Sequence, residues 1–250
     1  MDLQLHGKTA LITGASMGIG RAIATALAGE GVICAVAARR VALLQELREA
    51  IRDYGAPAPF PLEVDVLAEG APEWLADRAV QTLGHVDILV NCAGGSRPLP
   101  VDAPEERWTE AITLNFTRVR QLTHAVLPGM ISRRWGRIIN ITGKSEPEGL
   151  NAAFAAKAAV HAWAKGLSRE VGQHGVTVNC IAPGRIMSEQ IRRNYSEDYR
   201  REHARQEIAV GRYGEPEELA PLAVFLASPC AGYITGTVMP VDGGLRRYAF

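Results

Sequence analysis

The residues that point most clearly to a chemical function are three glycines, Gly14, Gly18 and Gly20. They lie between an apolar run at 9–12 and a stretch of helical composition at 21–27. A strand, a glycine-rich turn and a helix form the first unit of a dinucleotide-binding fold. The glycines allow a tight turn and let the backbone approach a pyrophosphate, while the N–H groups of the helix N-terminus face the anion. An ordinary glycine-rich loop has the same composition, so the prediction of a nucleotide site also depends on the rest of the chain.

The elements that would position this turn follow from alternating apolar runs and helical patterns. The expected strands are 9–12, 32–37, 60–64, 86–91, 137–141, 176–181 and 237–241. The expected helices are 21–27, 41–52, 72–83, 105–133, 152–171, 188–206 and 217–227, the fourth of them kinked near Pro128. This alternation predicts an α/β fold with one domain over residues 1–250. We expect a doubly wound parallel sheet of about seven strands, with helices on both faces.

Small and polar residues cluster where these strands end. In a parallel sheet of this kind, ligands bind beyond the carboxyl ends of the strands. The segments expected at that edge are 14–20, 38–39, 65–66, 91–95, 142–143 and 183–188. Six strand ends that converge on one edge are a stronger argument for a ligand site than any single motif.

The composition argues against several other functions. The chain has 27 basic and 27 acidic side chains and no long basic run, which disfavours nucleic acid and anionic membranes as partners. No apolar stretch approaches the length of a membrane span, and residues 1–4 do not resemble a signal peptide. The cysteines Cys34, Cys92, Cys180 and Cys230 are far apart and mostly in apolar runs. We therefore expect buried thiols of a cytoplasmic protein, and neither metal ligands nor disulfides.

Taken together, these segments resemble the short-chain dehydrogenase/reductase family over nearly the whole chain. The resemblance is carried by 13–20, Asp65-Val66, 91–94, Asn115, Lys157, Pro183-Gly184, 233–236 and 241–244. It implies a nicotinamide dinucleotide as cofactor, a small-molecule substrate, a substrate lid at about 186–210, and a homotetramer or homodimer. The cofactor-binding residues that it implies are Gly14, Ser16, Met17, Gly18, Ile19, Gly20, Arg39, Asp65, Val66, Asn91, Ala93, Gly94, Lys157, Pro183, Gly184, Ile186 and Ser188.

The end of the second strand indicates which dinucleotide is bound. A cofactor without a 2′-phosphate favours a carboxylate there, whereas a 2′-phosphate repels a carboxylate and requires a cation. Ala38 occupies the place where NAD-preferring relatives carry Asp, and Arg39 and Arg40 follow it. We therefore expect NADP(H), with NAD(H) as the less favoured cofactor. The alternative is that both arginines are solvated at the start of a helix.

The catalytic positions depart from the family pattern, in which a Ser, a Tyr and a Lys act together and the Tyr precedes the Lys by four residues. Asn115 and Lys157 match, but Ala153 stands at the tyrosine position and Gly143 at the serine position. The loop between 143 and 153 is also a few residues shorter than usual. Loss of a general acid costs ~10²–10⁴ in rate and loss of an oxyanion donor ~10²–10³. Cofactor binding requires neither group.

Candidate substitutes for the missing proton donor lie in two segments. Lys144, Ser145, Glu146 and Glu148 are in the shortened loop, and Tyr195 and Tyr199 are in the expected lid. Each of them is also compatible with a solvated surface position. His161, one helical turn after Lys157, is expected to pack between helices or subunits.

Three functional hypotheses remain open from the sequence. The leading one is an NADP(H)-dependent oxidoreductase that acts on a small carbonyl, enone or quinone with a non-standard proton donor. The second is a non-redox NADP-binding protein with a structural or regulatory role. The third is a lyase, isomerase or hydrolase that uses the same pocket.

Overall fold

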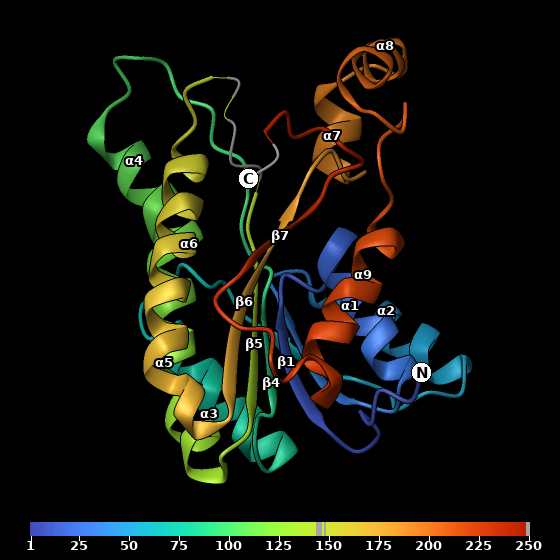
Figure 1. Ribbon diagram of the computed structural model, residues 1–250, viewed down its shortest axis with the longest axis vertical. Helices are drawn as coiled ribbons and strands as arrows, with labels where there is room; N and C mark the ends of the chain where they lie inside the picture. Colours follow the sequence, from blue (N-terminus) through green and yellow to red (C-terminus); the bar gives the residue numbers. More distant parts are fainter. Residues whose placement is uncertain (144–146, 148, 249–250) are drawn as a thin grey trace.

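Seven parallel strands form one sheet in the order β3-β2-β1-β4-β5-β6-β7 in the computed structural model, which describes residues 1–143, 147 and 149–248 (Figure 1). The strands are β1 (Thr9–Thr13), β2 (Ile33–Ala38), β3 (Phe60–Glu63), β4 (Ile88–Asn91), β5 (Gly136–Ile141), β6 (Val176–Pro183) and β7 (Val238–Val241). The chain winds outward from β1 to β3, returns to β4 beside β1, and continues to β7. The doubly wound parallel sheet predicted from the sequence is confirmed, with its topological switch point between β1 and β4.

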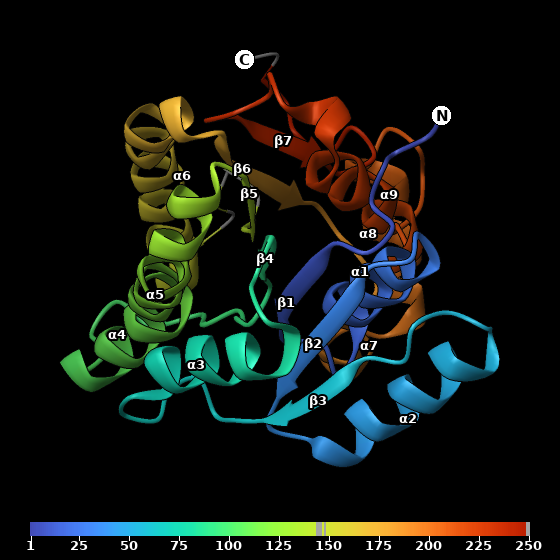
Figure 2. The same cartoon turned by 90° about the horizontal axis from the view of Figure 1, so that it is seen from below.

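Two layers of helices cover the sheet (Figures 1 and 2). One layer contains α1 (Gly18–Gly29), α2 (Val41–Asp53) and α9 (Pro216–Ala227). The other contains α3 (Ala71–Leu83), α4 (Glu105–Ile112), α5 (Arg118–Arg133) and α6 (Ala152–Val171). Short 3₁₀ turns at η2 (Gly172–His174) and η3 (Pro229–Ala231) follow α6 and α9.

Alternation of side chains along the central strands creates the two halves of the core. Leu11 of β1 and Leu89 of β4 pack in the cluster under α3, α5 and α6, whereas the next residues, Ile12 and Val90, pack in the cluster under α1 and α9. All four side chains are fully buried, and each such burial contributes about 1.5–3 kcal/mol to folding. The sheet is therefore a rigid support for the residues at its carboxyl edge.

The helix expected at 105–133 differs from the prediction. It consists of α4, a π-helical turn η1 (Thr113–Thr117) and α5. Pro128 lies within α5 and does not end that helix. The π-helical turn surrounds Asn115, and such turns are frequent at functional sites.

The segment between β6 and α9 contains two helices, α7 (Glu189–Asn194) and α8 (Glu197–Glu207), in agreement with the mostly helical insert expected at 188–206. Two serine caps explain the division. The Ser188 Oγ accepts a hydrogen bond from the Ile191 N–H, and the Ser196 Oγ accepts one from the Tyr199 N–H. Both helices lie at the same end of the molecule as α4 and the start of α6 (Figure 1).

Two of the four cysteines are buried as expected, and Cys92 is partly buried. Cys34 and Cys180 are buried, and burial raises the pKa of each thiol to about 12. Cys230 is exposed, so its expected burial is wrong. Within the described residues, no group of His, Cys, Asp or Glu side chains is arranged to hold a metal ion. Among the helices of the described residues, none is long and apolar enough to cross a membrane.

Candidate cofactor and active site

The glycine-rich turn between β1 and α1 packs tightly against the end of β4. Gly14 has a φ of +69°, and a Cβ at this position would lie 2.9 Å from the Ala93 nitrogen. A Cβ on Gly20 would lie 2.4 Å from the Gly14 carbonyl oxygen. The Thr13 Oγ1 accepts hydrogen bonds of 3.1 Å from the N–H groups of Cys92 and Ala93. Both glycines are therefore required by the packing of the backbone itself.

The N-terminus of α1 is suited to an anion. The helix begins at Gly18, its N-cap residue Met17 supplies no side-chain hydrogen bond, and its first turn contains no acidic residue. The first N–H groups of a helix have no acceptor within the helix, and the helix dipole attracts negative charge there. Ile19 packs against the core, and Ser16 is buried beside the turn. These residues fit the pyrophosphate that the sequence predicted.

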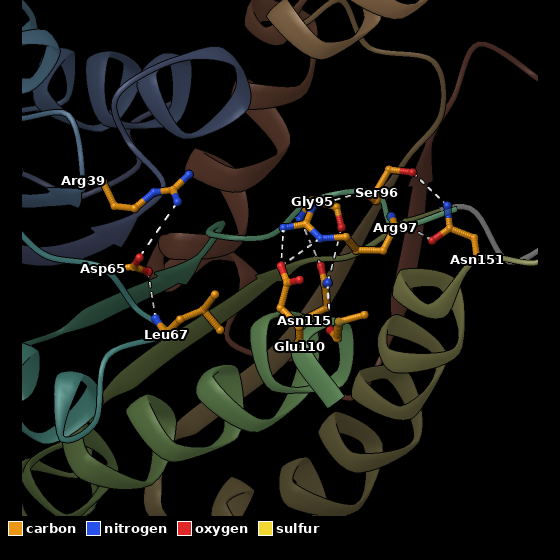
Figure 3. A network of polar contacts seen from close by, with 10 residues as sticks. Arg39, Asp65, Leu67, Gly95, Ser96, Arg97, Glu110, Asn115 and Asn151 are labelled. Atoms are coloured by element: carbon orange, nitrogen blue, oxygen red, sulfur yellow. Dashed lines mark hydrogen bonds and ion pairs between the residues drawn. The ribbon is translucent and has the colours of Figure 1, made fainter. Parts of the chain in front are cut away.

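The turn after β3 forms a second part of the edge. Arg39 Nη1 lies 3.9 Å from Asp65 Oδ2, and the Arg39 side chain is 74% exposed (Figure 3). A cavity beside this turn is lined by side chains that include Val66, Ala93 and Leu114. The wall of this cavity is largely apolar, and Arg39 is exposed beside the same turn.

Asn115 clamps the segment that follows β4. Its Oδ1 accepts a hydrogen bond of 3.1 Å from the Gly95 N–H, and its Nδ2 donates to the carbonyl oxygens of Gly95 (3.3 Å) and Ala111 (2.9 Å) (Figure 3). The residue is 2% exposed. Both amide hydrogens are used within the protein, so only the Oδ1 acceptor has capacity for a further hydrogen bond.

A second polar network, which the sequence analysis missed, joins the segment after β4 to the start of α6 (Figure 3). The Arg97 guanidinium donates to Glu110 Oε1 at 3.2 and 3.0 Å, and the Arg97 N–H donates to Asn151 Oδ1 at 3.0 Å. Asn151 Nδ2 donates to Ser96 Oγ, while Asn151 Oδ1 also accepts from the Ala153 N–H and caps α6. An Asn before an alanine-rich helix is a typical N-cap, so this sequence signal was available.

Lys157 reaches the end of β5. Its Nζ donates to the carbonyl oxygen of Thr142 at 2.7 Å. A Cβ on Gly143 would lie 3.4 Å from the Lys157 Cδ, so this strand end packs along the lysine side chain. Burial lowers the pKa of Lys157, and nearby Cys92 has a smaller, opposite effect.

His161 bonds to the same strand end, a contact that the sequence analysis did not predict. Its Nε2 lies 2.8 Å from Thr142 Oγ1, which donates to the Ile181 carbonyl oxygen at 3.1 Å. The Thr142 hydroxyl uses its hydrogen in the bond to Ile181, so it can only accept from His161. The imidazole proton is therefore assigned to Nε2. Burial, together with the nearby charge of Lys157, lowers the pKa of His161.

Asn91 uses its side chain within the fold. Its Nδ2 donates to Asn140 Oδ1 at 2.9 Å and to Thr123 Oγ1 at 3.0 Å, and all three residues are buried. The amide therefore joins β4, β5 and α5 below the edge where Ala93 and Gly94 lie.

The segment after β6 is held by close backbone packing. A Cβ on Gly184, which follows Pro183, would lie 2.6 Å from the Asp242 Cα. Ile186 is buried and forms a β-bridge with Gly214. Ser188 caps α7, and its hydroxyl hydrogen is not needed for that cap.

Tyr195, between α7 and α8, is part of an aromatic stack. Its ring lies parallel to that of Tyr199, with 5.0 Å between centroids, and the Arg185 guanidinium lies 5.6 Å from the Tyr195 centroid. The other predicted donors, Lys144, Ser145, Glu146 and Glu148, lie outside the described residues.

Comparison with known proteins now identifies the family. A family model described as enoyl-(acyl carrier protein) reductase matches residues 14–246. The 3-oxoacyl-[acyl-carrier-protein] reductase FabG of Pseudomonas aeruginosa is 36% identical over 97% of this chain and 99% of its own length. The chain belongs to the short-chain dehydrogenase/reductase family. Its place among these oxidoreductases agrees with the doubly wound sheet and the glycine-rich turn.

Solved structures of short-chain dehydrogenases/reductases superpose closely on the chain. L-sorbose reductase from Gluconobacter frateurii, in complex with NADPH and L-sorbose, has a TM-score of 0.93 at 30% identity and covers 99% of this chain and 100% of its own. A 7α-hydroxysteroid dehydrogenase in complex with NADH and 7-oxo glycochenodeoxycholic acid has a TM-score of 0.92 at 32% identity, with 97% and 96% covered. These two relatives hold different nicotinamide cofactors, so cofactor preference depends on individual residues of each chain.

Proposed function

We propose that this chain is an NADP(H)-dependent oxidoreductase that acts on a small carbonyl, enone or quinone substrate with a proton donor other than the family tyrosine. The observation that carries the proposal is the complete cofactor edge. Gly14 and Gly20 shape the turn, α1 begins without a side-chain cap, and Arg39 lies 3.9 Å from Asp65, the residue before Val66 of the cavity. Lys157 is held at the end of β5, next to the same edge.

The chain would hold NADP(H) through these segments. The N-terminus of α1 would bind the pyrophosphate, Arg39 the 2′-phosphate, and Asp65-Val66 with Ala93-Gly94 the adenosine. Lys157 would donate to the ribose beside the nicotinamide, and the Ile186 backbone with the Ser188 hydroxyl would hold the carboxamide. When bound, NADPH supplies a hydride to an electrophilic carbon of the substrate.

The substrate oxygen that gains negative charge on hydride transfer also requires a proton. The described residues restrict which group can donate that proton. Ala153 is 2% exposed and has no hydroxyl, and both amide hydrogens of Asn115 are used. The candidates are Lys144, Ser145 and Glu148 of the shortened loop and Tyr195 of the lid. An enone or quinone suits such a site because its product anion is delocalised and depends less on a general acid.

The test is a paired measurement of binding and turnover. NADPH and NADH affinities are measured by calorimetry, and NADPH oxidation is then followed with a simple ketone, an activated enone and a quinone. We expect tighter binding of NADPH and faster oxidation with the enone or quinone than with the ketone. The proton donor is then identified with four single substitutions, Lys144→Ala, Ser145→Ala, Glu148→Gln and Tyr195→Phe. The donor is the residue whose substitution abolishes turnover while NADPH affinity is retained.

A non-redox role is the second candidate, and one observation favours it. The Asn115 amide and the Lys157 ammonium both make hydrogen bonds to backbone groups of the protein, at Gly95 and Thr142. These contacts hold both side chains in place for cofactor binding, which requires neither the family tyrosine nor the family serine. Tight NADPH binding with no oxidation across the panel would support this role and contradict the first.

A further inference from the structure

Arg118, the first residue of α5, makes a set of contacts that the sequence analysis did not predict. Its Nη2 donates to the carbonyl oxygens of Leu67 (2.8 Å) and Ala68 (3.0 Å) in the turn after β3. Its Nη1 donates to Gln121 Oε1 at 2.8 Å, which orients the guanidinium. Arg118 therefore bridges two segments that are about fifty residues apart in the chain.

Asp65 holds the same turn from the other side. Its Oδ1 accepts a hydrogen bond of 2.9 Å from the Leu67 N–H, and its carbonyl oxygen accepts one of 3.0 Å from the Ala68 N–H. Within the turn, the N–H groups of Leu67 and Ala68 thus donate to Asp65, and the carbonyl groups of the same two residues accept from Arg118. The conformation of 65–68 is determined from both sides, and Val66 within it lines the cavity.

Arg118 lines this cavity as well, together with Val66, Ala93 and Leu114. The Nε of Arg118 is buried and has no hydrogen-bond partner among the described residues. A buried donor without an acceptor is destabilising, and the cost is removed when a ligand supplies the acceptor. A purine base presents ring nitrogens that are acceptors of this kind.

We propose that Arg118 is a positioning residue for the adenine end of the cofactor. It holds the turn at 65–68 so that Val66 faces the base, and it offers the Nε–H to a ring nitrogen of that base. This inference rests on the proposed function, because it requires the chain to bind an adenine dinucleotide. It assigns to α5 a role in binding the base, in addition to its packing on the sheet.

The test compares Arg118→Met with Arg133→Met. Arg133 is the matched control because it lies on the same helix and donates to a backbone carbonyl, that of Val86, at 2.7 Å, but at the opposite edge of the sheet. Calorimetry measures the affinity for NADPH and for 2′,5′-ADP, which contains the adenosine half alone. Hydrogen exchange measures the protection of amides 65–70 in the ligand-free protein. Arg118→Lys, which keeps one donor group, is the conservative variant.

We expect Arg118→Met to weaken both ligands by the same factor, about tenfold, with faster exchange at 65–70. We expect Arg118→Lys to be intermediate, and Arg133→Met to change affinity less than about twofold. Unchanged affinity, or weaker binding without faster exchange, would overturn the positioning role. If the unmodified chain bound neither ligand, both this inference and the proposed function would be wrong. If the chain bound both and Arg118→Met bound them equally well, only this inference would fail.

Discussion

Single side chains at the carboxyl edge decide which charges the site accepts. Arg39 is largely exposed and loosely paired with Asp65 at 3.9 Å, so its guanidinium is available to a ligand. Arg40, the next residue, is instead paired with Glu189 of α7 at 3.2 Å. A phosphate forms an ion pair with a guanidinium and can accept two parallel hydrogen bonds from it, whereas a ribose hydroxyl is neutral and has a single oxygen.

The first residue-scale prediction concerns Arg39. Arg39→Ala should weaken NADPH binding by about tenfold, equivalent to about 1.4 kcal/mol, and leave NADH binding nearly unchanged. Arg40→Ala is the control and should have a smaller effect, because Glu189 already neutralises that cation. Calorimetry with both cofactors measures the two ratios. Equal affinities of the unmodified chain for NADPH and NADH would contradict the NADP(H) assignment.

The second residue-scale prediction concerns His161. Because its pKa is lowered in the folded state, the unfolded chain binds more protons once the pH falls below the ordinary range for histidine, about 6.5. The free energy of unfolding should therefore decrease on acidification through this range. His161→Gln keeps a donor for Thr142 but cannot be protonated.

Thermal unfolding at about pH 7.5 and about pH 5.5 measures this effect. His161→Gln should lose less stability between the two values than the unmodified chain loses. His6→Gln, at an exposed position, is the control and should behave like the unmodified chain. An equal loss in all three proteins would show that His161 does not contribute to the acid sensitivity.

At the scale of the elements, the site depends on how the end of β5 meets the start of α6. Lys157 and His161 of α6 both bond to Thr142, while Asn151 caps the helix and ties it to the segment after β4. Ala153 lies in the first turn of α6 and is 2% exposed. The helix start is therefore held in place by contacts that leave little room at residue 153.

This arrangement predicts the outcome of restoring the family residues. Gly143→Ser combined with Ala153→Tyr should not give NADPH oxidation with simple ketones. A serine at 143 would meet Lys157 at an ordinary contact distance of 3.4 Å. A tyrosine at 153 would have to displace packed neighbours, and a misplacement of about 1 Å costs ~10² in rate.

The assay compares the double variant with the unmodified chain on ketones and activated enones, with NADPH affinity measured alongside. Retained affinity shows that the variant is folded and that the cofactor edge is intact. Rapid reduction of simple ketones by the double variant would contradict the view that the pocket is rebuilt for a different donor.

At the scale of the whole molecule, helix α6 carries a surface suited to self-association. Ala155, Ala158, Ala159 and Ala162 form an exposed row of small side chains on α6. Small residues let helix axes approach closely, and symmetric dimers bury the same surface on both subunits. This face is thus the first place to test for self-association.

We expect a dimer or tetramer at micromolar concentration, with the α6 face, the helix region 115–133 and the closing residues 241–250 in subunit interfaces. Ala158→Glu should shift sedimentation toward a smaller species, because it introduces a carboxylate into a close contact. Ala42→Glu, at an exposed position of α2, is the control and should leave the assembly intact. A monomeric unmodified chain would contradict the prediction.

The sequence by itself determined the fold class, and it predicted the edge at which a cofactor would bind, because both inferences depend on local patterns. Apolar runs such as the one around Leu11 predict buried strands, and parallel strands bring their carboxyl ends to one edge. Gly14 and Gly20 were recognisable because only glycine permits the close approach of Gly14 to the residues after β4 and of Gly20 to the Gly14 carbonyl. Lys157 and Asn115 were named from the resemblance to the family's motifs, and their catalytic roles stay a prediction.

The tertiary structure alone decided which groups those residues bond to. The π-helical turn at Asn115 left no signal in the hydrophobic periodicity, which records the buried side of a helix but not the pairing of its backbone. The contacts of Arg118 with Leu67 and Ala68, and of His161 with Thr142, join segments that are distant in sequence. Their partners are backbone carbonyls or a single hydroxyl, so residue types along the chain could not predict them. Such contacts form only when the sheet brings the strand ends together, because hydrogen bonds depend on distance and direction.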